Sequence, residues 1–180
     1  MQDYSITRKI SIDAAHRVST HGSKCRNLHG HRYVIEATCS ASAGALHGTG
    51  EQTDMLLDFA FLKELMERLI SDPCDHSLIA CIADLELLRM LAPEDADFED
   101  WKSQREQEIN EQGFSSTSAA RLETSLYVVS CQPTAERLAE HWFGKLTGPV
   151  GEISDGMAEL QRVRVWETPN CYADFVRPEG

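Results

Sequence analysis

The stretch "KCRNLHGHRYVIEATCSA", residues 24–41, carries several reactive side chains at the start of an expected β-strand. From residue 31 onward apolar residues alternate with polar ones, as on a strand with one buried face. Residues two apart on a strand point to the same side, so His29 and His31 should project together. The same face continues through Tyr33, Ile35, Ala37 and Cys39. The stretch is therefore either a metal site with the Cys25 thiol beside it, or a polar loop that leads into a core strand.

Three further strands and two helices are expected around this one. Alternation predicts strands, and an apolar stripe at helical spacing after a capping residue predicts helices. The expected strands are residues 4–16, 160–167 and 171–176. The first expected helix begins after Asp58 and ends at Pro73, and the second begins at Thr134. Outside residues 81–130 the order is β-β-α-α-β-β. This pattern is typical of an α+β fold with an antiparallel sheet.

The segment from residue 81 to 130 differs from the rest in charge. Residues 84–123 hold eleven acidic and four basic side chains, a net charge of −7 out of −12 for the whole chain. We predict helices at Leu85–Leu91 and Phe98–Ile109, a loop at 113–120 and a short strand near 126–130. The weak apolar pattern predicts a peripheral element with few packing contacts. Excision of roughly residues 84–123, with a short linker, should therefore leave the metal site intact, because long surface insertions are tolerated.

Length and composition limit the class of protein. With 180 residues, 42% of them hydrophobic, the chain predicts one globular domain, residues 1–180, with an insertion at about 81–130. It has no run of about 20 apolar residues, and charges stand near the N-terminus where a signal peptide needs an apolar stretch, so we expect a cytoplasmic protein without a membrane partner. Its six cysteines should then stay reduced. The net charge argues against nucleic acid as a partner.

Three histidines are candidates for a metal site. His16 ends the first expected strand on its apolar face, and a hairpin could bring it to His29 and His31. Three neutral imidazoles with an open fourth position are the arrangement of a catalytic zinc. A single histidine on an apolar face is more often a hydrogen-bonded core residue. The spacing alone leaves these two alternatives balanced.

Other polar residues each allow a structural and a functional interpretation. Cys25 is either a small buried side chain or a thiolate favoured by the cations Lys24 and Arg26. The pair "DH" at positions 75 and 76 is either a polar helix terminus or a carboxylate-oriented histidine for proton transfer. Glu167, at the end of an apolar strand row, is either a paired edge residue or a buried anchor for a cationic or amidine-like ligand edge.

Together, six pieces of the sequence resemble one known family, the 6-pyruvoyl-tetrahydropterin and 6-carboxy-tetrahydropterin synthases. The pieces occur in the family's order and cover about residues 4–80 and 131–180. They are "DAAHR", "KCRNLHGHRY", "LDFAFLK", "CDHSLI", "PTAERLAEHWF" and "VRVWETPNCYA". The resemblance implies the tunnelling fold, a four-stranded antiparallel sheet with two helices on one face. It also implies a homo-oligomer, a hexamer built as a dimer of trimers, with active sites at subunit interfaces.

The resemblance also implies roles for individual residues. The zinc ligands would be His16, His29 and His31. The catalytic thiol would be Cys25, with Asp75 and His76 completing its proton-transfer system. The carboxylate that holds the amino-pyrimidine edge of the pterin would be Glu167, with Thr134 and Glu136 as further pocket residues. Ala135 departs from the pattern, because some members have a second threonine there.

The implied substrate is 7,8-dihydroneopterin triphosphate, for which Lys24, Arg26 and Arg32 are candidate phosphate contacts by proximity only. In the family, a three-residue gap between the cysteine and the H-G-H pair is typical of the bacterial carboxy-forming type, and "CRNLHGH" has three. We therefore predict 6-carboxy-5,6,7,8-tetrahydropterin, acetaldehyde and triphosphate as products, in a lyase step toward 7-deazaguanine compounds such as queuosine. The alternatives are a pyruvoyl-forming synthase, a non-catalytic pterin- or zinc-binding relative, and an unrelated three-histidine zinc hydrolase.

Overall fold

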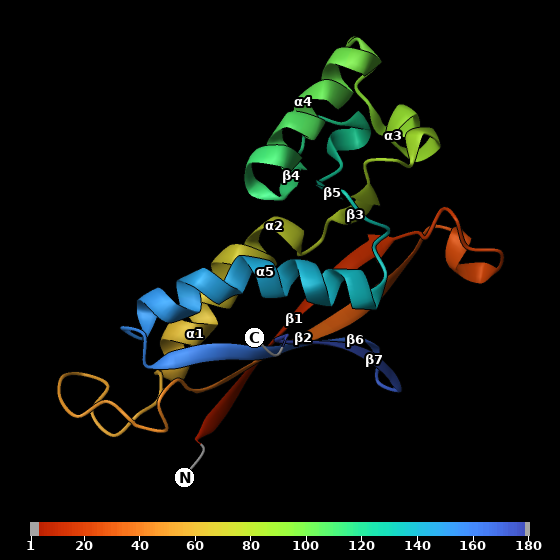
Figure 1. The fold of residues 1–180 in the computed structure, drawn as a ribbon. Coiled ribbons are helices and arrows are strands. Elements are labelled where there is room, and N and C mark those ends of the chain that lie inside the picture. The colour runs from red at the N-terminus through yellow and green to blue at the C-terminus, as the bar shows by residue number, and fades with distance from the viewer. Residues whose placement is uncertain (1–3, 179–180) are drawn as a thin grey trace.

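A seven-stranded mixed sheet, in the order β4-β5-β3-β1-β2-β6-β7, runs through the whole molecule (Figure 1). The computed structural model describes residues 4–178. The strands are β1 (Ser5–His16), β2 (His29–Ala41), β3 (Leu78–Cys81), β4 (Phe114–Thr117), β5 (Leu126–Val129), β6 (Ala158–Thr168) and β7 (Cys171–Val176). The helical elements are η1 (Lys24–Arg26), α1 (Phe59–Met66), η2 (Glu67–Ser71), α2 (Asp72–Cys74), α3 (Leu85–Leu91), α4 (Phe98–Gln112), η3 (Arg121–Glu123) and α5 (Ala135–Ile153).

The four strands expected from alternation form the antiparallel part of this sheet. β1 pairs with β2, β2 with β6 and β6 with β7. The α+β class is confirmed. The predicted sheet of four strands is too small, because β3 and β5 extend the sheet as parallel strands and β4 pairs with β5 at its edge. Every residue of β3 and β5 is buried. Such four-residue apolar runs carry no alternation, so periodicity could not assign β3.

Helices α1 and α5 cover the same face of the antiparallel strands (Figure 1). The apolar stripes expected on both helices are buried there, with Trp142 of α5 completely inaccessible. Asp58 and Thr134 cap the two helices through their side chains, as expected. The first helical run ends at Cys74 rather than before Pro73. Pro73 lies in the first turn of α2, where a proline needs no hydrogen-bond donor.

The acidic segment has a core of its own, at the end of the sheet where Figure 1 shows α3, α4 and β4. α3 has the predicted bounds, while α4 runs three residues past Ile109 to a left-handed Gly113. The prediction of a loop at 113–120 is wrong for Phe114–Thr117, which pairs with β5. The expectation of few packing contacts is also wrong. The second core contains Leu78, Ala80, Leu87, Leu88, Leu91, Ala92, Trp101, Ile109, Leu126 and Val128.

None of the helices within residues 4–178 is long and apolar enough to cross a membrane.

Candidate metal centre and active site

Strand pairing brings the three predicted metal ligands together. His16 lies directly opposite His29 in the β1–β2 register, and His31 lies two residues further along β2. The ring centroid of His16 is 4.6 Å from that of His29 and 5.2 Å from that of His31. Each histidine offers one ring nitrogen to a group whose atoms all lie within 4.8 Å of one another. The histidine cluster therefore has the compactness that one metal ion requires.

Backbone carbonyls orient two of the rings. The Nδ1 atoms of His16 and His29 lie 2.7 Å from the carbonyl oxygens of Pro133 and Asn27, respectively. With Nδ1–H donating to a carbonyl, Nε2 keeps its lone pair for a metal. The Nε2 atoms of His16 and His31 are buried and have no hydrogen-bond partner among residues 4–178. Buried nitrogens left without a partner fit a metal site, because an unsatisfied polar atom is otherwise costly.

The surroundings of the cluster favour neutral imidazoles. Burial lowers the pKa of His16 and of His31, although the Glu167 carboxylate opposes the shift in both. The neutral ring is the form that binds a metal. Tyr33, which sequence reasoning placed only in the core, packs the edge of its ring against His16 and His31 at 5.8 Å and 5.5 Å. Burial raises the pKa of the Tyr33 hydroxyl, so this side chain stays neutral where it packs against the histidines.

Gly30 allows the two strands to approach beside the cluster. A Cβ atom at this position would lie 3.1 Å from the carbonyl oxygen of Ala14. That oxygen belongs to the paired strand and cannot move aside like a flexible side chain. This close approach of the Ala14 carbonyl explains why a glycine stands between His29 and His31.

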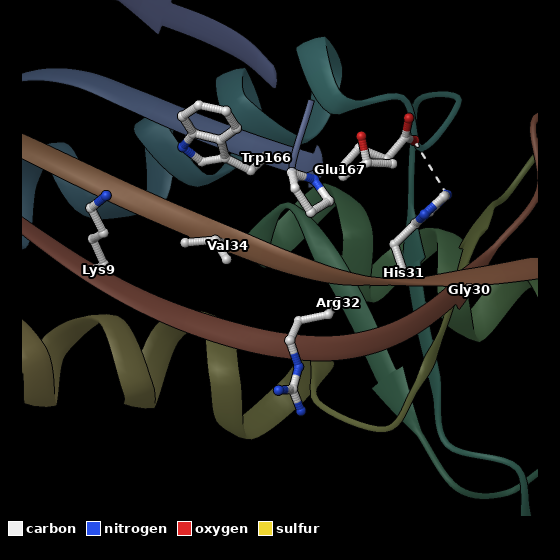
Figure 2. A pocket seen from close by; sticks show the side chains of 9 residues that line it. Lys9, Gly30, His31, Arg32, Val34, Trp166 and Glu167 are labelled. Atoms are coloured by element: carbon white, nitrogen blue, oxygen red, sulfur yellow. Dashed lines mark ion pairs between the residues drawn. The ribbon is translucent and has the colours of Figure 1, made fainter. Parts of the chain in front are cut away.

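Glu167 faces the histidines from the end of β6. Its Oε1 atom is 3.5 Å from His16 Nε2 and 3.8 Å from His31 Nε2, and Figure 2 shows the carboxylate directed at the His31 ring. The side chain is 30% exposed. This is the partly buried position beside the cluster that a ligand anchor needs. The same geometry would also allow Glu167 to serve as a fourth metal ligand, a role that sequence reasoning did not consider.

A cavity of about 290 Å³ gathers four of the predicted site residues. Cys25, on the single turn η1, lines it together with Thr134 and Glu136 at the start of α5 and with Glu167. Cys25 is partly exposed. The cavity therefore joins the thiol to the carboxylate that touches the histidine cluster. Sequence reasoning missed Val18, His21, Cys171, Tyr172 and Ala173, which also line it.

Asp75 and His76 do not join this cavity. They lie near Asp13, whose backbone N–H donates to Asp75 Oδ1 at 2.8 Å. His76 has a positive φ of 55°, its side chain is 82% exposed, and its Nε2 is 4.0 Å from Asp75 Oδ2. It shares a separate cavity with His31. Within residues 4–178 of one subunit, the expected system of Cys25, Asp75 and His76 is not assembled.

A larger cavity of about 530 Å³ lies beside β2 and β6, lined by Lys9, His31, Arg32, Trp166 and Glu167 among others (Figure 2). Its two cations are both paired. Arg32 binds Asp13 through two hydrogen bonds, and Lys9 lies 2.8 Å from Glu36. By contrast, Lys24 and Arg26 form no ion pair within the described part of the chain. Of the three cations expected near a triphosphate, Lys24 and Arg26 are therefore the two without an ion-pair partner among the described residues.

Fold and site together define an α+β protein with a three-histidine, metal-type centre beside a cavity that holds a thiol and a carboxylate. The family model described as "6-pyruvoyl tetrahydropterin synthase" matches residues 5–178. The chain belongs to this family. The predicted family is thereby confirmed over nearly the whole sequence, including the acidic segment.

Curated relatives carry the name 6-carboxy-5,6,7,8-tetrahydropterin synthase. The protein of Haemophilus influenzae is 28% identical over 172 residues, covering 96% of this chain and 98% of the relative. The protein of Rickettsia bellii is 29% identical over 168 residues, covering 93% and 96%. Among solved structures, an uncharacterised protein of Wolinella succinogenes matches with a TM-score of 0.70 at 22% identity, covering 99% and 100%. The Caenorhabditis elegans 6-pyruvoyl tetrahydropterin synthase matches with a TM-score of 0.58 at 21% identity, covering 99% and 98%.

Proposed function

We propose that this chain is a cytoplasmic, zinc-dependent lyase that converts 7,8-dihydroneopterin triphosphate to 6-carboxy-5,6,7,8-tetrahydropterin, with release of acetaldehyde and triphosphate. The reaction would be a step toward 7-deazaguanine compounds such as queuosine. The observation that carries the proposal is the histidine cluster, in which the Nε2 atoms of His16 and His31 have no hydrogen-bond partner among residues 4–178 and lie beside the carboxylate of a thiol-containing cavity. The names of the curated relatives support the same reaction.

In this proposal His16, His29 and His31 hold the zinc ion. Bound there, zinc would supply Lewis acidity toward the side-chain hydroxyls of the substrate. The pairing of His16 with His29 across β1 and β2, and the two carbonyl contacts at Nδ1, support a preformed set of ligands. Three protein ligands leave a position open, as in catalytic rather than structural zinc sites.

The remaining residues bind the substrate and move protons. Glu167 would accept hydrogen bonds from the amino-pyrimidine edge of the pterin, with Thr134 and Glu136 completing the pocket. Cys25, in the same cavity, would act as a base that removes a proton from the substrate side chain onto its Sγ. Lys24 and Arg26 flank the thiol and would contact the triphosphate, a good leaving group. Their freedom from ion pairs within the described residues supports this role.

A neighbouring subunit would supply Asp75 and His76. In one chain His76 and Cys25 line different cavities, and Asp75 lines neither of them, so a second copy would bring these residues together. The β1 edge supports such an assembly. On β1, β3 pairs only with Ala15 and His16, so within the described residues the first part of that β1 edge has no strand partner and could pair with another chain. A hexamer built as a dimer of trimers is therefore compatible with the insertion.

The product follows from the gap of three residues between Cys25 and His29 and from the names of the relatives. A pyruvoyl-forming synthase is the second candidate, supported by the family model and the solved structures of that name. The intact Cys25, Asp75 and His76 argue against a non-catalytic relative. A zinc hydrolase of three histidines would have no need for the thiol.

Incubation with dihydroneopterin triphosphate and identification of the products tests the proposal. We expect the carboxy pterin, acetaldehyde and triphosphate. Cys25→Ala should still bind the pterin but turn over about 10²–10⁴-fold more slowly, the range for a lost general base. Cys25→Ser should be only slightly better, because a hydroxyl is a far weaker acid. Triphosphate release without acetaldehyde would favour the pyruvoyl product, and full activity of Cys25→Ala would contradict the mechanism.

A further inference from the structure

The residues that follow the metal ligand His16 are each held by a separate contact. Arg17 makes two hydrogen bonds of 2.6 Å to the two carboxylate oxygens of Asp84. The backbone N–H of Val18 donates to the carbonyl of Cys25 at 2.8 Å. The backbone N–H of Ser19 donates to the side-chain carbonyl of Gln132 at 3.0 Å. These three contacts determine the path of the thiol loop, which we define as residues 17–28.

Asp84 belongs to the acidic segment and is unusually well held for a carboxylate. Its side chain is 3% exposed and that of Arg17 is 18% exposed. Asp84 also accepts from the backbone N–H of Leu87 as the N-cap of α3. A buried, two-pronged arginine–carboxylate pair has a narrow range of geometries. The pair therefore ties the start of the thiol loop to a helix of the second core.

The residues that directly follow the acidic segment contact the site as well. β5 leads within a few residues to Gln132, which holds Ser19, and to Pro133, whose carbonyl receives the Nδ1 contact of His16. A peripheral decoration would have no contact with either the metal ligand or the loop beside it. Here Asp84, near the start of the segment, binds Arg17, and the chain that leaves the end of the segment contacts His16 and Ser19 through Pro133 and Gln132.

We propose that the acidic segment positions the metal ligand His16 and the thiol loop, with Asp84 and Arg17 as positioning residues. This inference rests on the proposed function in taking His16 as a zinc ligand. It reverses the expectation from sequence that excision of residues 84–123 leaves the site intact, because excision would remove both Asp84 and Glu86 and leave the Arg17 guanidinium largely buried without a carboxylate partner.

The test compares Asp84→Asn with wild type in two measurements on the full chain. Asparagine keeps the shape and the capping ability of aspartate but loses the charge that holds Arg17. The first measurement is the zinc dissociation constant of the metal-depleted protein, by competition with a chromophoric chelator. We expect an increase of about tenfold, the lower end of the range for a lost outer partner of a metal ligand. The second is the rate of Cys25 alkylation by iodoacetamide, resolved by peptide mass spectrometry, which should rise in the metal-free protein.

Two further variants make the comparison specific. Glu99→Gln is the matched control, since it removes a carboxylate of the same segment whose ion-pair partner is the exposed Arg89; it should change neither measurement. Arg17→Lys keeps the charge but not the two-pronged geometry, and should resemble Asp84→Asn. It decides the question if Asp84→Asn does not fold.

Unchanged zinc affinity and unchanged alkylation in the folded variants would overturn the proposal, even if the midpoint of thermal unfolding fell. Such a result would give Asp84 a merely structural role. If the wild type itself binds no zinc, the proposed function fails. The alkylation rate of Cys25 then still decides whether the segment positions the loop.

Discussion

Zinc should stabilise this protein by an amount that depends on the histidine cluster. In the metal-free chain the Nε2 atoms of His16 and His31 are buried without a hydrogen-bond partner among the described residues, and each such atom costs about 1–3 kcal/mol. Binding at about 100 times the dissociation constant adds about 2.7 kcal/mol to the free energy of unfolding. For a chain of this size, 1 kcal/mol raises the unfolding midpoint by about 2–4 °C. Saturating zinc should therefore raise the midpoint by about 5–11 °C.

The assay is thermal unfolding of metal-depleted protein with and without zinc, together with elemental analysis of the purified wild type. His29→Ala removes one ligand and should lose the zinc response, bound zinc and activity together. His47→Ala is the matched control, because His47 is also buried with an unpartnered Nε2 but lies outside the cluster. The reasoning is refuted if His29→Ala responds like wild type, or if active wild type contains no stoichiometric divalent metal.

Three other changes test the site and its support. Glu167→Gln removes charge-assisted hydrogen bonds worth about 1.5–3 kcal/mol and should weaken pterin binding about 10- to 150-fold in calorimetry while zinc content stays unchanged; loss of zinc would instead make Glu167 a ligand. Gly30→Ala should lower zinc affinity, measured by chelator competition, because its Cβ would crowd the Ala14 carbonyl; an unchanged affinity would contradict that steric argument. Burial lowers the pKa of His141 from 6.5 to about 4, so the unfolded chain binds the extra proton first and stability falls as the pH drops from 6.5 toward 4. Between pH 7 and pH 5 His141 should account for a loss of about 2 kcal/mol in urea unfolding, so His141→Gln should lose about 2 kcal/mol less than wild type, while His16 and His31, whose pKa values burial also lowers, keep their share.

Local patterns in the sequence anticipated which side chains lie together at the candidate site better than they anticipated the sheet that supports it. Alternation along the long strands identified which face His16, His29 and His31 occupy, because a strand has one simple period. Strand ends and helix starts then indicated Glu167 and Thr134. Each of these inferences needed only local spacing, and the register of β1 with β2 brought the pieces together.

Contacts between distant segments left no local signal. β3 is four buried residues long, too short to be distinguished from part of a helix by periodicity. The carbonyls of Pro133 and Asn27 orient two imidazoles, but any residue has a carbonyl, so no side chain marked them. In the sequence Asp84 is one of eleven acidic residues in its segment, with nothing to distinguish it. Only the fold shows that Asp84 is buried against Arg17.

The position of the acidic segment is compatible with the proposed assembly, in which another chain would use the sheet edge. β3 meets β1 only at Ala15 and His16, the end of the strand at which the metal ligand lies. Pairing further along β1 would cover the edge that the proposed assembly uses, while pairing nowhere would remove the link that holds this segment beside residues 15–17. The observed register meets both requirements. The segment contacts the site through Arg17, the first residue of the thiol loop, and in the proposed assembly the rest of the β1 edge is available to a second copy of the chain.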